Sequence, residues 1–362
     1  MARQNRSEIF DPQEISVMHC INRAVRRAML CGVDKFSGKS YEHRRDWIKN
    51  RLIHLARFYG IDVLGYAIMG NHMHVILRNR PDVVKTWSDQ EIARRIWYLF
   101  PKRKDKDGLA ADPTEFELNS LCGSRKNVQE YRRRLSDISW LMRQLAEHVA
   151  IKANREDDCT GRFWEGRFKS QPLLDEAAIL ACSAYVDLNP VRALIAETPE
   201  ESDFTSVQDR IESVKILKRV TRKTVGRKRT KRQKQQIVET LRDRFLAPVY
   251  LNERKQTGPQ VSKSESRASD KGFLPIKLLD YLQLVEWTGR QIIRGKRGRI
   301  PDRCQPILDR LGVSREIWCE LVKEFGRLFG RVAGSPDSLI KSAESSGIAG
   351  RRSRGGPELL AG

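Results

Sequence analysis

Two histidines separated by one apolar residue are the first feature of this sequence that suggests chemistry. They lie in residues 70–77, which read Gly-Asn-His-Met-His-Val-Ile-Leu and are β-like from His72 onward. Side chains alternate between the two faces of a strand, so His72 and His74 share one face. Two neighbouring imidazoles supply half of a metal site, and for this pair alone zinc is as plausible as any other ion.

Tyr185 and Asn189 form a second pair, in residues 183–193, which read Ser-Ala-Tyr-Val-Asp-Leu-Asn-Pro-Val-Arg-Ala. Four residues apart, they share one face of a helix that Pro190 stops. A phenol nucleophile and an amide oxygen ligand would be presented together. If Asn189 and both histidines coordinated a divalent ion, the ion would keep open coordination positions for phosphate oxygens. Tyr185, a weak nucleophile as a neutral phenol, would depend on that polarisation and form a phosphotyrosine that conserves the energy of the phosphodiester.

Each motif also has an ordinary structural interpretation. A His-x-His on a strand is commonly two half-exposed polar residues, and a Tyr-x-x-x-Asn before proline is commonly a packing tyrosine and a helix-ending asparagine. His19 is interpreted as a satisfied strand residue rather than a ligand. Asp187 is expected on the surface, and Glu165, although it could assist a metal or act as a base, is expected to face solvent.

The composition favours a polyanionic partner. Lys and Arg number 68 against 46 Asp and Glu, which gives a net charge of +22. No run approaches the roughly 18 apolar residues of a membrane span, and the N-terminus lacks the apolar core of a signal peptide. Nucleic acid is therefore the expected partner, a membrane is not, and the expected location is cytoplasmic. The seven cysteines contain no C-x-x-C pair and predict buried, reduced thiols.

Basic residues gather in two segments that suit a phosphate backbone. Residues 162–174 interleave basic and aromatic side chains, which fits either strand packing or contact with DNA. Residues 215–234 are a basic block that fits either a solvated linker or phosphate neutralisation. The candidate DNA-binding residues are Arg162, Trp164, Arg167, Lys169, Arg192, Arg227, Lys228 and Arg229.

The elements that must position these residues follow from periodicity. Residues 15–23 predict a strand, 41–59 an amphipathic helix, 61–69 and the histidine run a hairpin, and 88–100 a helix capped by Ser88. This order predicts an α+β fold of the ferredoxin-like kind, an antiparallel sheet with helices on one face. The other face would be free to hold a ligand.

The remaining chain predicts further units. Residues 101–134 are interpreted as an insertion, 135–153 and 176–189 as helices, and 162–174 as strand-like. We expect a nuclease-like domain over 1–214, a basic and polar linker over 215–271 with a flexible joint at 257–271, and a small all-α C-terminal region over 272–340. A disordered tail is expected over 341–362.

Taken together, these motifs resemble the HUH single-tyrosine transposases, and within them the REP-associated tyrosine transposase-like group. The resemblance covers roughly residues 14–210 and lies in Asn71–His74, in Gly-Arg-Phe-Trp-Glu-Gly-Arg-Phe-Lys-Ser at 161–170, and in Tyr-Val-Asp-Leu-Asn-Pro-Val-Arg-Ala at 185–193. It implies a ferredoxin-like nuclease that cleaves single-stranded DNA beside hairpins with Mg²⁺ or Mn²⁺. Tyr185 would attack, stay linked to a 5′-phosphate and leave a free 3′-OH, while His72, His74 and Asn189 hold the ion.

Three functions are compatible with the sequence. The first is a metal-dependent tyrosine transposase that cuts and rejoins hairpin or single-stranded DNA. The second is a DNA-binding regulator in which catalysis is idle or lost, and the third is a structural metal protein. Tyr185, both histidines and Asn189 together favour the first, because binding alone requires none of them. A homodimer, with Tyr185 used in its own or the partner's site, is compatible with the resemblance.

Overall fold

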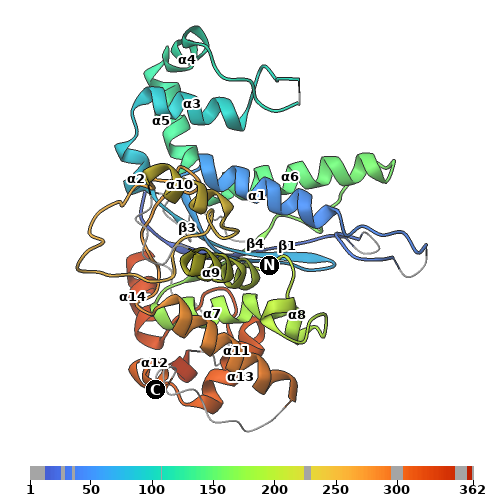
Figure 1. Cartoon of the computed structure of the whole chain (residues 1–362), viewed down its shortest axis with the longest axis vertical. Helices are drawn as coiled ribbons and strands as arrows, with labels where there is room; N and C mark the ends of the chain where they lie inside the picture. The colour runs from blue at the N-terminus through green and yellow to red at the C-terminus, as the bar shows by residue number, and fades with distance from the viewer. Residues whose placement is uncertain are drawn as a thin grey trace.

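One antiparallel sheet forms the centre of the protein (Figure 1). The computed structural model describes residues 13–25, 29–34, 37–106, 108–223, 230–294, 305–346 and 357–360. The strands are β1 (Val17–Arg23), β2 (Ile61–Ile68), β3 (His72–Asn79) and β4 (Lys169–Leu173), in the order β2-β3-β1-β4. With β1 and β3 in the middle this is the ferredoxin-like order, and the predicted α+β class is confirmed.

The central strand β3 has two faces of different character. Met73, Val75 and Leu77 are buried in the hydrophobic cluster of the first face. His72 and His74 point to the second face, as the alternation of a strand requires. Strand pairing places His74 opposite Ile21 of β1 and Ala67 of β2. The histidines therefore lie at the N-terminal end of β3, between two neighbouring strands.

Helices cover both faces of the sheet. On the first face, α1 (Arg44–Phe58) and α6 (Ile138–Glu156) bury their apolar sides against the sheet. On the second face, α7 (Glu176–Asp187) and α9 (Ser206–Lys223) contact β2. The sequence predicted helices on one face, and the structure adds this second layer. Strand β2 explains the second layer: every one of its residues is buried, so both of its faces are covered by other elements.

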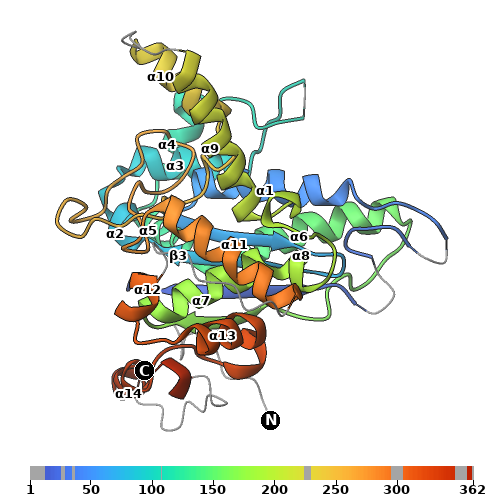
Figure 2. The same cartoon turned by 60° about the horizontal axis from the view of Figure 1, so that its bottom comes forward.

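The C-terminal region is helical and packs on the second-face layer. Buried residues of α11 (Leu278–Arg294) and α13 (Arg315–Leu328) share one hydrophobic cluster with α7. Figure 2 shows α11 and α13 beside α7, and α9 leading away from the sheet toward α10 (Lys231–Thr240). The expected domain boundary at 214/215 falls inside α9. Of the tail expected to be disordered, residues 347–356 and 361–362 lie outside the described residues.

The remaining elements are short. Residues 101–134, read as an insertion, contain two helices that the sequence interpretation missed, although Thr114 and Glu117 form a capping box at the first of them. The additional elements are α2 (Pro81–Thr86), α3 (Asp89–Leu99), α4 (Glu115–Cys122), α5 (Arg125–Leu135), α8 (Asn189–Arg192), α12 (Gln305–Arg310), α14 (Pro336–Ser346) and 3-10 turns at Pro199–Glu201 and Glu358–Leu360. No helix among the described residues is apolar over a length that would cross a membrane.

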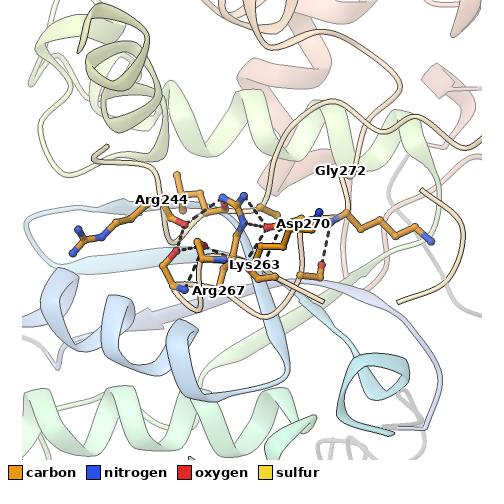
Figure 3. Close-up of polar contacts among 12 residues, drawn as sticks. Arg244, Lys263, Arg267, Asp270 and Gly272 are labelled. Atoms are coloured by element: carbon orange, nitrogen blue, oxygen red, sulfur yellow. Dashed lines mark hydrogen bonds and ion pairs between the residues drawn. The ribbon is translucent and has the colours of Figure 1, made fainter. Parts of the chain in front are cut away.

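The segment expected to be a flexible joint is fastened to the rest of the protein by its polar groups. Asp270 accepts hydrogen bonds from the Arg267 side chain (3.0 Å) and the Lys263 backbone (3.1 Å), which folds the loop on itself (Figure 3). Arg267 also donates to the carbonyl oxygens of Arg244 (3.2 Å) and Leu246 (2.9 Å). The polar composition of this loop thus serves internal hydrogen bonds.

Candidate functional site

His72 and His74 lie side by side where β3 begins. Their ring centroids are 4.8 Å apart, and the rings stand edge to face. His74 is 2% exposed, whereas His72 is partly open to solvent. Burial lowers the pKa of His72 to about 4 and that of His74 well below its ordinary value, with smaller contributions from Arg23 and neighbouring histidines. Both imidazoles are therefore neutral at pH 7 and can offer a lone pair.

Tyr185 and Asn189 approach the same histidine from the opposite layer. Helix α7 ends at Asp187, because Pro190 has no backbone N–H with which to continue its hydrogen bonds, and Asn189 with Pro190 begins α8. Although two helical segments carry them, both side chains reach His74. The Asn189 Nδ2 atom is 3.2 Å from His74 Nε2, and the Tyr185 and His74 ring centroids are 5.7 Å apart.

The spacing of Asn189 and His74 is compatible with a small divalent ion. Cis ligands of an octahedral Mg²⁺ at about 2.1 Å are about 3 Å from each other, which is close to the 3.2 Å between the Asn189 amide and His74 Nε2. A half-turn of the amide exchanges Nδ2 for the oxygen. His72 Nδ1 is 2.6 Å from Asn71 Oδ1, which leaves its Nε2 for a ligand. The amide of Asn189 would supply a third ligand, and no cluster of three His, Cys, Asp or Glu suited to a metal occurs among the described residues.

A pocket of about 520 Å³ opens in front of Tyr185 and the two histidines. Arg192 stacks on the Tyr185 ring with its guanidinium carbon 4.7 Å from the centroid. The charged side chains that line the pocket are mostly basic: Arg23, Arg167, Lys169, Arg192 and Arg327, against Glu165 and Glu324. Such a pocket favours an anion beside the phenol.

The predicted DNA-binding residues divide into three groups. Arg167, Lys169 and Arg192 line the tyrosine pocket. Arg162 and Trp164 instead line an adjoining groove of about 830 Å³ between α6 and residues 162–168. Trp164 is 9% exposed and donates to the Ala146 carbonyl oxygen, which leaves little of its ring for a base. Arg227, Lys228 and Arg229 lie outside the described residues.

Several pocket residues escaped the sequence interpretation. Arg23 continues the alternation His19, Ile21 on β1 and could have been found from it. Glu324, Gly326 and Arg327 come from α13, more than a hundred residues beyond Tyr185, and no local pattern connects them to the site. A Cβ atom at Gly326 would be 3.2 Å from the Tyr185 hydroxyl, so α13 forms a wall directly against the phenol.

Asp187 is buried, and the prediction that it lies on the surface is wrong. It is 2% exposed and accepts hydrogen bonds from the Ser206 hydroxyl, the Val207 backbone and the Tyr281 hydroxyl. Burial raises the pKa of its carboxyl. Because a second helical layer packs on α7, the side that faces away from the sheet is still interior. Asp187 therefore joins α7, α9 and α11, and Glu165 is exposed at the pocket rim as expected.

Comparison with known proteins adds little to this geometry. No protein-family model matches the chain, and no curated protein matches it. A solved structure described as a REP-associated tyrosine transposase bound to a REP hairpin is 12% identical, with a TM-score of 0.34, over 59% of this chain and 86% of that one. A likeness at this TM-score carries no functional assignment.

Proposed function

We propose that this protein is a metal-dependent single-strand DNA endonuclease and strand transferase of the tyrosine transposase type, acting at hairpin DNA. One observation carries the proposal: Tyr185, His72 and His74 line one pocket whose charged lining is mainly basic, and Asn189 lies 3.2 Å from His74. A structural metal site needs neither an open pocket nor a nucleophile beside it. A phosphodiester provides the anion that such a pocket attracts and the electrophile that a phenol can attack.

His72, His74 and Asn189 would hold a Mg²⁺ or Mn²⁺ ion. Such an ion polarises a non-bridging phosphate oxygen and orients the phosphate. The protein contributes the neutral state of both imidazoles, which follows from burial, and the approach of Asn189 from a different layer. Three protein ligands leave the other positions to the DNA and water.

Tyr185 would act as the nucleophile in this site. Its hydroxyl oxygen forms a bond to phosphorus while the bond from phosphorus to the 3′ oxygen breaks. The phenolic proton passes to water in the open pocket, and the 3′ oxygen takes up a proton as it leaves. The products are a 5′-phosphotyrosine and a free 3′-OH, and the reverse attack by a 3′-OH rejoins a strand. The Arg192 guanidinium would stabilise negative charge on phenol and phosphate.

The nucleophile can be tested with a labelled single-stranded hairpin and Mn²⁺. Wild-type protein should form a covalent adduct that survives denaturing electrophoresis. Tyr185→Phe should reduce the adduct at least about 10³-fold, since it removes the only attacking oxygen, while hairpin affinity changes little because Lys and Arg contacts carry it. Tyr250→Phe, at an exposed tyrosine away from the pocket, is the matched control. An adduct with undiminished yield from Tyr185→Phe would exclude this nucleophile.

A DNA-binding regulator is the second candidate, and the position of α13 favours it, since a Cβ atom at Gly326 would lie 3.2 Å from the Tyr185 hydroxyl. The C-terminal helix α13 lies against the phenol and limits the space around its hydroxyl. If wild-type protein binds hairpins tightly yet forms no adduct on any of them with Mn²⁺ or Mg²⁺, the regulator is the better description.

A further inference from the structure

His74 is the second member of a chain of four hydrogen-bonded side chains that ends on the backbone beyond α13. We propose that His19 and Gln171 are positioning residues for the metal ion, because they hold His74 in the tautomer whose lone pair faces Asn189. This inference rests on the proposed function, since the ion is the one that the endonuclease would use. It assigns a role to His19, which the sequence marks only as a strand residue.

At the Asn189 end of this row of side chains, the amide determines which atom of each hydrogen bond is the donor. An amide NH₂ group only donates, so His74 Nε2, 3.2 Å from Asn189 Nδ2, accepts and carries the lone pair. The proton of this neutral imidazole is therefore on Nδ1, which donates to His19 Nε2 at 2.9 Å. His19 in turn carries its proton on Nδ1 and donates to Gln171 Oε1 at 3.4 Å.

The Gln171 end of the row determines the same order of donors and acceptors independently. Gln171 Nε2 donates to the carbonyl oxygens of Phe329 (3.1 Å) and Gly330 (3.0 Å), which can only accept. Gln171 must therefore turn Oε1 toward His19, and His19 must present an unprotonated Nε2 to His74. The tautomer of His74 consequently stays fixed when the Asn189 amide turns its oxygen toward an ion.

Burial protects the chain from competition by water. His19 is 1% exposed, His74 2% and Gln171 8%. The chain crosses three neighbouring strands, from β4 through β1 to β3, and the His19 and His74 rings lie nearly parallel at 5.1 Å. Partners that orient a metal-bound histidine typically change metal affinity 10–100-fold when they are removed. The C-terminal region would thus set metal affinity without touching the metal.

The test compares two variants of the full-length chain at His19. Gln keeps one acceptor and one donor, whereas Leu keeps neither. Mn²⁺ titration calorimetry should show affinity about 10–100-fold weaker for His19→Leu and close to wild type for His19→Gln. His54→Gln should leave Mn²⁺ affinity unchanged, because His54 bonds the Tyr98 carbonyl oxygen and is not part of the row of side chains that includes His19 and His74.

A second readout does not require the metal. The chain has six histidines, so ¹⁵N-histidine labelling gives a simple spectrum in which loss of the signal in His74→Gln identifies His74. Two-bond ¹H–¹⁵N correlations should show the Nδ1–H form of His74 in wild type and His19→Gln, and a shift toward Nε2–H in His19→Leu. If His19→Leu does not fold, Gln171→Leu interrupts the row of hydrogen-bonded side chains one residue further from His74. It should also weaken Mn²⁺ binding.

The outcomes separate the two proposals. Wild-type protein that binds no Mn²⁺ contradicts the metal-dependent function itself. Wild-type protein that binds Mn²⁺, with affinity unchanged in a folded His19→Leu or Gln171→Leu, overturns the positioning role alone. An Nε2–H tautomer of His74 in the metal-free wild type overturns it as well.

Discussion

The Tyr185 ring is enclosed by side chains from distant parts of the chain. The Arg192 guanidinium lies over it, the His74 ring meets it edge to face, and Phe325 of α13 packs beside it at 5.5 Å between centroids. The aromatic neighbours fix the direction of the phenol. Arg192 alone among these three carries a charge at neutral pH, so its effect on reactivity can be separated from packing.

Replacing Arg192 with Gln should slow adduct formation. Loss of the positive charge removes stabilisation of the anion that forms at Tyr185 and phosphate, and we expect a rate about 10–100-fold lower. Single-turnover kinetics with saturating hairpin measure this rate separately from binding. Arg125→Gln removes the same charge from an exposed position on α5 and serves as the control. Equal slowing in both variants would mean that only overall charge matters.

His54 provides a pH-dependent contribution to stability away from the site. Burial, and next the charge of Arg51, lower its pKa from 6.5 to about 4 in the folded protein. Above pH 6.5 the residue is neutral in both states and has no effect. Between pH 6.5 and 4 the unfolded chain takes up a proton that the folded protein does not, so stability falls as the pH falls, and below pH 4 the loss is complete.

The size of this loss can be measured by urea unfolding at pH 7.5 and pH 4.5. Allowing for the partial exposure of His54, we expect roughly 1–2 kcal/mol from this residue. His54→Gln keeps an N–H donor for the Tyr98 carbonyl and does not titrate, so its stability should depend less on pH by that amount. The same pH dependence in wild type and variant would show that His54 does not contribute.

At the scale of elements, α13 is both part of the core and part of the pocket. Phe325 is fully buried against α7, and the next residue, Gly326, faces the Tyr185 hydroxyl. The absence of a side chain at this position leaves the phenol its room. Stability and activity therefore make opposite demands on Gly326.

Gly326→Ala should separate these two demands. Alanine in place of glycine stabilises a helix interior by up to about 1 kcal/mol, whereas its Cβ would press on the Tyr185 hydroxyl at 3.2 Å. We expect unchanged or raised thermal stability together with an adduct yield several-fold lower, and a greater loss for Gly326→Leu. A variant with wild-type yield and raised stability would show that α13 leaves the phenol free to move.

The sequence predicts those parts of the site that depend on local spacing. His72 with His74, and Tyr185 with Asn189, lie within four residues of each other, and strand or helix geometry then brings each pair to one face. The bond between Asn189 and His74 spans 115 residues, and that between His19 and His74 spans 55. Only the tertiary fold sets such contacts. Helix α5 was missed because its apolar residues are few, and α4 because it is only eight residues long; Leu118 and Val128 are their buried residues before Leu135.

At the scale of the whole molecule, several contacts join the chain beyond residue 214 to the sheet, including the hydrogen bonds of Gln171 to the backbone after α13. Two more lie in the interior. One is the hydrophobic cluster that α11 and α13 share with α7. The other is Asp62 of β2, which is fully buried and accepts hydrogen bonds from Arg78, Arg80 and the Ser269 backbone. Arg78 also donates to the carbonyl oxygens of Lys271 (2.7 Å) and Gly272 (2.8 Å). One carboxylate thus holds two guanidinium groups and a loop from two hundred residues away.

Asp62→Ala should therefore destabilise the whole molecule. It leaves Arg78 and Arg80 buried without their shared carboxylate, and breaking a buried ion pair costs about 3–5 kcal/mol. Urea unfolding measures the loss, and trypsin cleavage at Lys263, Arg267 or Lys271 reports release of the loop. Asp82→Ala removes the partly exposed second partner of Arg80 and should cost less. If both variants lose the same small amount and the loop stays resistant to trypsin, Asp62 is not an anchor of the C-terminal region, which the hydrophobic cluster and the other hydrogen bonds to the sheet then hold.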